Sequence, residues 1–310
     1  MVPTMRVTLA VTGGTGFVGG HVLVAATARG HRVRALARRP QPPRDGVEWV
    51  PGDLADQGSL ARLVEGADVV VHVAGVVNAR DAAGFVAGNV RGTAAMRMAA
   101  GPRPFVHVSS LAAREPRLSL YGTSKLAAEH VARGCAGPVA MVRPPAVYGP
   151  ADREMLALFR AARLGLVPVP AGARAALIFA TDLAHALVAL AEDLAGAGRS
   201  AGGCFEIDDG SGGHGQAELV RAIGAAMGRR VRALEVPGAA LRLGAAVDTW
   251  RARLAGTLPK LSFDRARYLA HCDWSADSRP LLALGLWQPR VALAEGLAET
   301  IAWYQREGWL

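Results

Sequence analysis

The chain has 310 residues, of which 51% are hydrophobic and 20% charged, so it can form one large globular domain or two closely joined ones. Its net charge of +9 comes from arginines scattered along the chain, without the dense basic runs of a nucleic-acid surface. Three widely separated cysteines favour neither a disulfide framework nor a metal site, and no apolar run reaches the roughly 18–20 residues of a membrane span. We therefore expect a cytoplasmic protein that binds a small molecule, with no metal, no nucleic acid and no integral membrane segment.

The first 150 residues alternate short apolar runs with helical patterns. The predicted elements are strands at 6–11, 33–37, 47–50, 68–75, 104–110 and 138–150, and helices at 17–29, 59–67, 85–101 and 121–134. This alternation predicts an α/β fold with a doubly wound parallel sheet of the Rossmann type.

After residue 150 the rhythm of the sequence changes. A helix and loop at 154–172 precede an apolar strand and helix at 176–198, a strand, glycine-rich loop and helix at 203–229, and mainly helical sequence to the end. We predict a dinucleotide-binding domain at 1–150, to which 175–192 return. Residues 151–174 and 193–310 are predicted to form a smaller, mostly helical substrate-binding lid.

The stretch "TGGTGFVGG" lies between the first predicted strand and the first predicted helix, with Gly13, Gly16 and Gly19 at a three-residue spacing. Glycines there let the backbone approach a pyrophosphate, and the helix N-terminus offers unpaired N–H groups and the positive end of the helix dipole. The alternative is a tight turn without a ligand. The position at the first strand–helix turn favours dinucleotide binding.

The end of the second strand carries Arg38 and Arg39, where an NAD-binding fold would carry an acidic residue. Arginine suits a ribose 2′-phosphate, which favours NADP over NAD, although both arginines could simply be exposed residues. After the third strand, Asp53 could contact the adenine amino group or cap the next turn.

The stretch "YGTSK" carries Tyr121 and Lys125, and Lys260 is the chain's other lysine. The pair is four residues apart in a predicted helix, so both side chains lie on one face. An ammonium beside a phenol, with the positive ring of an oxidised nicotinamide nearby, favours the phenolate and is expected to lower the pKa of the tyrosine. Read alone, the pair could equally be a core aromatic residue and a solvated charge.

Seven pieces of sequence occur in a characteristic order, namely "TGGTGFVG", "GDL", "HVAG", "NVRGTA", "VHVSS", "YGTSK" and "RPPAVYGP". In these pieces the chain resembles the extended short-chain dehydrogenase/reductase superfamily, the epimerase/dehydratase-like branch. The resemblance spans most of residues 5–150. It implies catalytic roles for Ser110, Tyr121 and Lys125, with tyrosine as general acid or base and serine as anchor of the substrate oxygen.

The resemblance and the glycine loop together give the predicted cofactor-binding set. Asn89 is expected to support the lysine or the cofactor, and Pro145 and Val147 to lie against the nicotinamide. The full set is Gly13, Thr15, Gly16, Phe17, Val18, Arg38, Arg39, Asp53, Leu54, Val73, Ala74, Gly75, Asn89, Ser109, Tyr121, Lys125, Pro144, Pro145 and Val147.

The substrate is less clearly marked than the cofactor. The span from Ser110 to Tyr121 is shorter than in sugar-nucleotide enzymes, and the chain's last 50 residues resemble those of 3β-hydroxysteroid-dehydrogenase-like members. We expect hydride transfer between nicotinamide and a hydroxyl or keto carbon of a lipophilic or medium-sized substrate. The alternatives are a nucleotide-sugar epimerase or reductase with retained NAD and a non-catalytic NAD(P)-binding sensor or assembly subunit. Related proteins also suggest a homodimer through the helices near Asn89 and Tyr121.

Two further groups of residues have open interpretations. An apolar, arginine-bearing helical pattern with Leu241, Leu243 and Trp250 is either a lid helix packed on the core or a lipophilic entrance or membrane-surface contact. His72, His107 and His185 lie in predicted strands or helices and are interpreted as satisfied core or edge histidines rather than catalytic groups.

Overall fold

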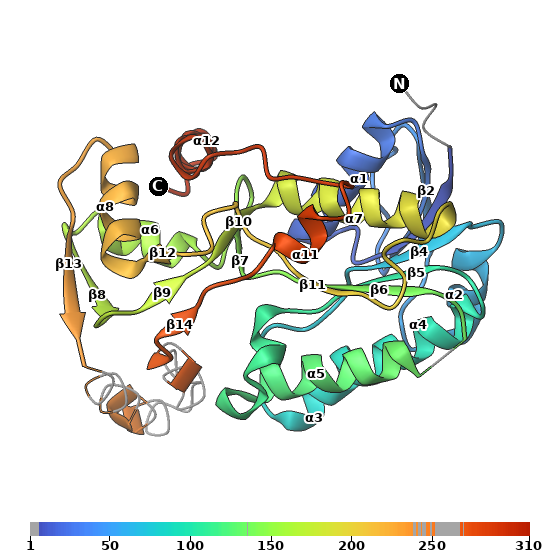
Figure 1. The fold of residues 1–310 in the computed structure, drawn as a ribbon, viewed down its shortest axis with the longest axis horizontal. Coiled ribbons are helices and arrows are strands. Elements are labelled where there is room, and N and C mark those ends of the chain that lie inside the picture. The colour runs from blue at the N-terminus through green and yellow to red at the C-terminus, as the bar shows by residue number, and fades with distance from the viewer. Residues whose placement is uncertain are drawn as a thin grey trace.

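The computed structural model describes residues 6–134, 136–237 and 270–310, together with 240, 243, 246–248, 250–251 and 267–268. Seven strands pair in parallel, in the order β11-β6-β5-β4-β1-β2-β3, which confirms the doubly wound sheet (Figure 1). The strands are β1 (Thr8–Thr12), β2 (Arg32–Ala37), β3 (Val47–Pro51), β4 (Val69–His72), β5 (Phe105–Val108), β6 (Val139–Arg143) and β11 (Cys204–Glu206).

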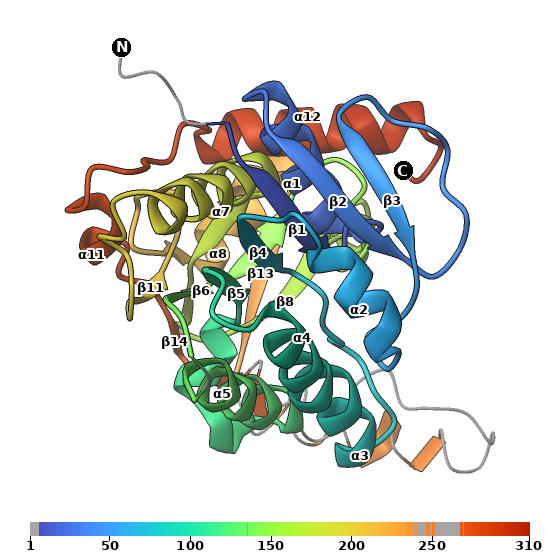
Figure 2. The same cartoon turned by 90° about the vertical axis from the view of Figure 1, so that its right-hand side faces the viewer.

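Helices cover both faces of this sheet, as Figure 2 shows. On one side lie α1 (Phe17–Ala28) and α7 (Ala180–Ala195), and on the other α2 (Gln57–Val64), α4 (Gly92–Ala100) and α5 (Leu120–Arg133). Successive strand residues point to opposite faces, so in β4 Val69 and Val71 pack with α1 and α7 while Val70 packs with α2 and α4. Burial on both faces explains why this strand is an unbroken apolar run.

Two predicted elements are divided in the structure. The helix predicted at 85–101 consists of α3 (Ala82–Phe85), a π-helical turn η1 (Val86–Arg91) and α4. The strand predicted at 138–150 consists of β6 and of β7 (Ala146–Tyr148), which leaves the main sheet and pairs with β10 (Leu177–Phe179). Pro144 and Pro145 separate β6 from β7, because proline has no N–H to continue a ladder.

A second apolar core lies beyond the sheet, on the left of Figure 1. It is formed by α6 (Leu156–Ala162), α8 (Gln216–Ala226), α12 (Leu293–Arg306) and the parallel pair β8 (Leu166–Pro170) and β13 (Arg232–Val236). Three short strands, β9 (Arg174–Ala175), β12 (His214–Gly215) and β14 (Asp273–Trp274), form a further small sheet. The lid therefore contains more β-structure than the mostly helical lid that was predicted.

The boundary predicted at residue 193 is too early for the sheet. Residues 204–206 form β11, the edge strand beside β6, and Leu281 of α11 (Arg279–Leu282) and Trp287 are buried in the core of the Rossmann domain. Asp182 of α7 fastens this later segment, since its carboxylate accepts the backbone N–H groups of Arg290 and Val291 at 2.9 Å each. The chain therefore crosses between the two cores more than once.

Candidate active site

The glycine loop after β1 packs so closely on neighbouring backbone that Gly13 and Gly19 have no room for a side chain. Gly13 has φ +76°, and a Cβ there would lie 2.7 Å from the backbone nitrogen of Ala74. A Cβ on Gly19 would overlap the carbonyl oxygen of Gly13. The first turn of α1 begins at Gly16, which has no side chain to cap the N–H groups of the helix. This backbone cradle and these free donors fit a pyrophosphate.

The site lies where the order of the strands reverses. From β1 and β4, which are neighbours, the chain continues to strands on opposite sides, and folds of this kind bind their ligands in a crevice at the carboxyl ends of two such strands. Val73 and Ala74 hold the loop after β4 against β1, with their N–H groups donating to the carbonyl and hydroxyl oxygens of Thr12 at 3.2 and 3.4 Å. The glycine loop after β1 and the residues after β4 therefore lie side by side, with Gly13 against Val73 and Ala74.

Asn89 fixes the loop after β4 to the helix that carries the tyrosine. Its Oδ1 accepts the N–H of Val76 at 2.7 Å, and its Nδ2 donates to the carbonyl of Val76 at 3.0 Å and to Oγ of Ser124 at 2.9 Å. The Ser124 hydroxyl donates in turn to the carbonyl of Tyr121. Asn89 lies in the π-helical turn, a distortion that occurs often at functional sites. These contacts make Asn89 a residue that positions the loop after β4 against α5.

Ser110, Tyr121 and Lys125 come together at the mouth of the crevice. Ser110 follows β5 and its side chain is hydrogen-bonded to Tyr121. Tyr121 and Lys125 lie one turn apart on α5, whose N-terminus is capped by Ser119 through the N–H of Gly122 at 3.0 Å. The ammonium of Lys125 is buried and donates to the carbonyl of Val108 at 2.7 Å.

Burial controls the pKa values of this group. Desolvation lowers the pKa of Lys125 to about 8, against the attraction of the Glu129 carboxylate. Desolvation also raises the pKa of Tyr121, with the hydrogen bond from Ser110 opposing it and the charge of Glu154 reinforcing it. In the protein alone the pKa of the phenol is therefore raised, and the lowering expected beside an oxidised nicotinamide stays a prediction. The phenol carries its proton at neutral pH and can act as an acid.

Ser109 belongs to the predicted cofactor-binding set, but its hydroxyl is hydrogen-bonded within the protein. The hydroxyl donates to the buried carboxylate of Glu129 at 2.6 Å, which also receives two hydrogen bonds of 2.8 Å from Arg143. Burial alone would raise the pKa of Glu129, but the hydrogen bonds from Arg143 and Ser109 outweigh it and lower the pKa. Neighbouring serines thus serve different sites because successive residues after a strand point to opposite sides.

The outer residues of the predicted set lie along the same carboxyl edge. Arg38 and Arg39 follow β2, and in the described part of the chain their exposed side chains form no hydrogen bond or ion pair. Asp53 follows β3 and accepts the N–H of Ala55 at 2.9 Å, which is the turn-capping alternative. The other members lie on α1, after β3 or around β7: Thr15 and Phe17 at the start of α1, Val18 against the main core, Leu54 after β3, and Pro144, Pro145 and Val147 around β7.

The lid contributes groups that the sequence did not mark. Tyr268 stacks on Trp274 with ring centroids 4.5 Å apart and packs with Leu111 and Leu118, which flank Ser110 and Tyr121 in sequence. Burial and the proximity of Tyr121 raise the pKa of Tyr268 to about 12. No local pattern marks this residue, because it reaches the site only through the tertiary fold.

Arg114 fastens the lid to the segment after Ser110. Its guanidinium donates to the carbonyls of Ser275 and Asp273 at 2.8 and 2.9 Å and pairs with Glu206 at 3.2 Å. The lid segment that contains Trp274 is therefore attached directly to the short 3₁₀ turn η2 (Leu111–Arg114), which begins after Ser110.

The histidines lie outside this chemistry. His72 shares hydrogen bonds with the hydroxyls of Thr12 and Thr93 at 2.7 and 3.1 Å, and burial lowers its pKa to about 3. His107 is stacked on His72 and burial lowers its pKa well below the usual value, but neither of its ring nitrogens has a partner among the described residues. It is a core histidine, though not a satisfied one. His185 is half-buried on α7. The described residues contain no group of three or more His, Cys, Asp or Glu side chains that could hold a metal ion.

The fold and this crevice define an NAD(P)-dependent enzyme of the extended short-chain dehydrogenase/reductase type. The model of the NAD dependent epimerase/dehydratase family matches residues 9–200, and the chain belongs to this family.

Similar proteins include a ceramide reductase and a hydroxysteroid dehydrogenase. The chain is 40% identical to a ceramide reductase of Caulobacter vibrioides over 321 aligned positions, which cover 100% of this chain and 98% of the relative. It is 28% identical to a 3 beta-hydroxysteroid dehydrogenase/Delta 5-->4-isomerase of Mycobacterium tuberculosis, over 75% of this chain and 72% of the relative. The crystal structure of the Bordetella bronchiseptica enzyme WbmG in complex with NAD superposes with a TM-score of 0.73 at 20% identity, covering 100% of this chain and 97% of that one.

The matched family and these relatives identify the protein as an oxidoreductase, and the interpretation as a non-catalytic subunit is not favoured. Among the described residues, no helix combines the length and the apolar character needed to cross a membrane.

Proposed function

We propose that the protein is an NADPH-preferring reductase that converts a keto group of a ceramide-like lipid into a hydroxyl group. The observation that carries the proposal is the Ser110–Tyr121–Lys125 arrangement at the mouth of a dinucleotide crevice, in a chain that matches a ceramide reductase over its whole length. The proposal goes beyond that relative's name in the choice of cofactor and in the roles of the residues.

The preference for NADPH rests on the residues after β2. Arg38 and Arg39 are exposed, unpaired in the described part of the chain and placed at the carboxyl edge of the strand, where a 2′-phosphate on the adenosine ribose would lie. No acidic residue stands there to receive the 2′-hydroxyl of NAD. The glycine cradle and the uncapped first turn of α1 would hold the pyrophosphate, and Lys125 would bind the nicotinamide ribose.

The chemistry follows from the positions of the hydroxyl groups. The bound nicotinamide cofactor supplies the hydride that is added to the carbonyl carbon. Tyr121 and Ser110 donate hydrogen bonds to the carbonyl oxygen, and the proton of Tyr121 moves to that oxygen as negative charge develops on it. The ammonium of Lys125 stabilises the resulting phenolate until a proton from solvent restores the phenol. Tyrosine that keeps its proton at neutral pH suits this direction of reaction.

An apolar wall beside the tyrosine supports a lipophilic substrate. Leu111, Leu118, Tyr268 and Trp274 form one cluster where the lid meets the catalytic segment. Apolar side chains at this junction suit a hydrocarbon chain better than a charged diphosphate.

Replacing Tyr121 with phenylalanine tests the mechanism. The variant should reduce a ceramide-like ketone at least about 100-fold more slowly, because the proton donor is lost, while its affinity for NADPH stays near that of the wild type. Tyr268→Phe is the matched control, since it removes a phenol beside the site that the mechanism does not use. Wild-type rates for Tyr121→Phe would refute the mechanism.

The choice of substrate and cofactor needs a separate measurement. Purified protein is assayed with a ceramide-like ketone, a 3-ketosteroid and UDP-sugars, with NADPH and NADH in parallel. The second candidate, a nucleotide-sugar epimerase with retained NAD, predicts nicotinamide absorbance in the protein as purified and turnover of UDP-sugars without added cofactor. That outcome would replace the proposal. A homodimer through α4 and α5 remains a prediction, for which the partly exposed apolar side chains of Val86 and Met98 offer contact surface.

A further inference from the structure

One end of the molecule exposes leucines on a small sheet. Strands β8 and β13 pair so that Leu166 lies beside Arg232 and Leu234 beside Pro168, all on the outward face. Val167 and Val169, on the inward face, are buried in the second core. Leu166 and Leu234 are each about half exposed, and Leu164, in the turn before β8, is 85% exposed. Several large apolar side chains on one face indicate a contact surface, since single exposed leucines are ordinary but clusters are not.

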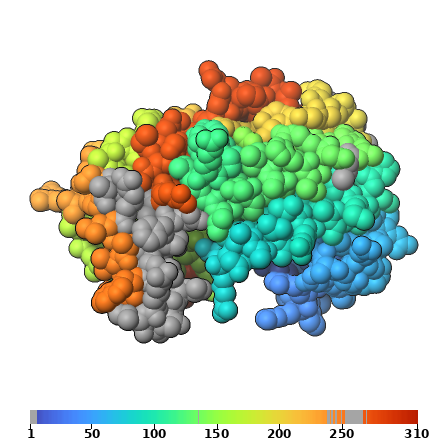
Figure 3. Space-filling view, turned by 90° about the horizontal axis from the view of Figure 1, so that it is seen from below, coloured from blue at the N-terminus to red at the C-terminus, as the bar shows by residue number. Residues whose placement is uncertain are grey.

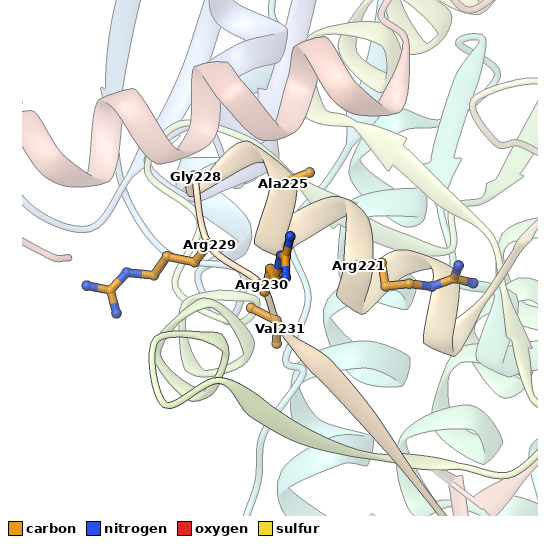
Figure 4. A pocket seen from close by; sticks show the side chains of 6 residues that line it. All are labelled: Arg221, Ala225, Gly228, Arg229, Arg230 and Val231. Carbon is orange, nitrogen blue, oxygen red and sulfur yellow. The ribbon is translucent and has the colours of Figure 1, made fainter.

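Exposed arginines lie in the same part of the molecule as these leucines, and Arg232 pairs directly with Leu166. Arg221, Arg229 and Arg230 line a shallow pocket of about 490 Å³ at the end of α8, next to β13 (Figure 4). Their guanidinium groups point in different directions in Figure 4, so they do not converge on one ion. Arg232 is exposed on β13 itself, and Glu235 is the acidic residue of that strand. A set of diverging cations suits a surface that carries many negative groups better than a single phosphate.

The segment after β13 continues the pattern. Its described residues between 240 and 251 are helical, and Leu243, Val247 and Trp250 are exposed, with Trp250 at 63%. Their spacing of four and three residues places them on one helix face. Leu241, which the sequence analysis grouped with them, lies outside the described residues. These three side chains are therefore not buried in the core, and whether the helix packs on the core through its other residues stays an open interpretation.

The leucines of β8 and β13 and the exposed residues of 240–251 lie at the same end of the molecule. In Figures 1 and 3 the segment that includes β13 and the described residues of 240–251 stands at the end farthest from the N-terminal strands. From there the chain leads to Tyr268, beside Tyr121. The surface and the substrate side of the site thus belong to the same part of the chain.

We infer that this end of the protein, from Leu164 and Leu166 through Arg230, Arg232 and Leu234 to Trp250, binds the surface of an anionic phospholipid bilayer. Leucine and tryptophan enter the boundary between headgroups and acyl chains, while the arginines bind the negative headgroups. Charge complementarity selects this partner, since the surface is basic on a chain of net charge +9. The inference goes beyond the proposed function and does not depend on it, because binding requires no turnover.

Vesicle flotation tests the inference with the full-length protein. Wild-type protein should float with phosphatidylcholine vesicles that contain phosphatidylglycerol, should stay behind with pure phosphatidylcholine, and should bind less as salt is raised. Arg230→Gln with Arg232→Gln should bind roughly thirty-fold more weakly, from about a fivefold loss for each arginine near the bilayer. Leu164→Ser with Leu234→Ser should bind at least about tenfold more weakly, because two apolar side chains no longer enter the interface.

Matched controls lie elsewhere on the surface. Arg6→Gln with Arg32→Gln removes the same charge near the N-terminal strands, and Met98→Ser removes an exposed apolar side chain on α4. Both should bind as the wild type does. Equal binding to neutral and anionic vesicles, or an equal loss in the Arg6 and Arg32 control, would overturn the inference. So would self-association that the leucine variants abolish, without any flotation, because a second copy would then be the partner.

Turnover separates this inference from the proposed function. All surface variants should reduce a short, water-soluble ketone at the wild-type rate, since none of the changed residues touches the crevice. If the wild type floats but reduces no ceramide-like ketone, the proposed function fails while the bilayer inference stands.

Discussion

Replacing Lys125 with methionine is expected to stabilise the protein while removing its activity. The ammonium is buried, and desolvation lowers its pKa from 10.5 to about 8. The charged form is thus less favourable in the folded protein than in the unfolded chain by about 3 kcal/mol at neutral pH, at about 1.4 kcal/mol per pKa unit. Methionine removes this penalty but also loses the 2.7 Å hydrogen bond to Val108, which costs about 1 kcal/mol. The net stabilisation is about 2 kcal/mol.

The sign of the pH dependence makes this prediction specific. Between pH 8 and about 10.5 the unfolded chain binds the lysine proton and the folded protein releases it, so wild-type stability rises with pH. The methionine variant lacks this titration. Its advantage should therefore be full below pH 8 and should shrink by about 3 kcal/mol as the pH approaches 10.5, ending in a slight disadvantage.

Thermal unfolding without added cofactor measures both effects. At pH 7 the variant should melt roughly 3–6 °C above the wild type, and the difference should close between pH 8 and 10.5. Tyr121→Phe is the control, because it keeps the lysine and should show no such convergence. A variant that is less stable than the wild type at pH 7, with a difference independent of pH, would refute the argument that burial of this ammonium destabilises the fold.

Three other substitutions test separate parts of the site. Gly19→Ala should weaken dinucleotide binding at least about 100-fold in a fluorescence titration, because the new Cβ overlaps the carbonyl of Gly13. Gly20→Ala is the control and should bind normally, since a Cβ there has nothing within 4 Å. Arg38→Gln with Arg39→Gln should raise the KM for NADPH by roughly tenfold to 100-fold and leave that for NADH nearly unchanged, and an equal effect on both would remove the argument for NADP. Glu129→Gln should destabilise the protein by about 3 kcal/mol at pH 7, because Arg143 loses its buried partner. The pKa of Glu129 is lowered in the folded state, so the difference in stability between wild type and variant should be complete above about pH 5. It should decrease as the pH falls through the lowered pKa. Denaturant unfolding at several pH values measures this.

Much of the Rossmann domain could be predicted from the sequence because its signals are local. The glycine spacing, the four-residue interval between Tyr121 and Lys125 and the unbroken apolar run of β4 each depend on the geometry of one strand or one turn of helix. Parallel strands place their carboxyl ends at one edge, so residues that follow different strands could be predicted to meet. The double serine likewise predicted a serine beside the tyrosine, and its second member, Ser110, is hydrogen-bonded to Tyr121.

The environment of each group was decided by the tertiary structure. Sequence spacing placed a lysine beside a tyrosine and suggested a lowered phenol pKa, but burial proved the larger effect, and burial depends on all the elements packed around α5. Ser109 could not be separated from the cofactor set without knowing that Glu129 and Arg143 lie behind it. The interruption of the predicted helix at Asn89 by a π-helical turn had no sequence signal either.

The sequence by itself determined the class of chemistry, because strand, loop and helix geometry act over a few residues and "TGGTGFVGG" and "YGTSK" each fit within that range. Only the tertiary structure decided what surrounds that chemistry. β11 returned to the main sheet, Tyr268 came to stand beside Tyr121, and the leucines of β8 and β13 were left facing outward. These outcomes depend on contacts between segments far apart in the chain, which no local pattern records, and they are the features that bear on the substrate and the partner.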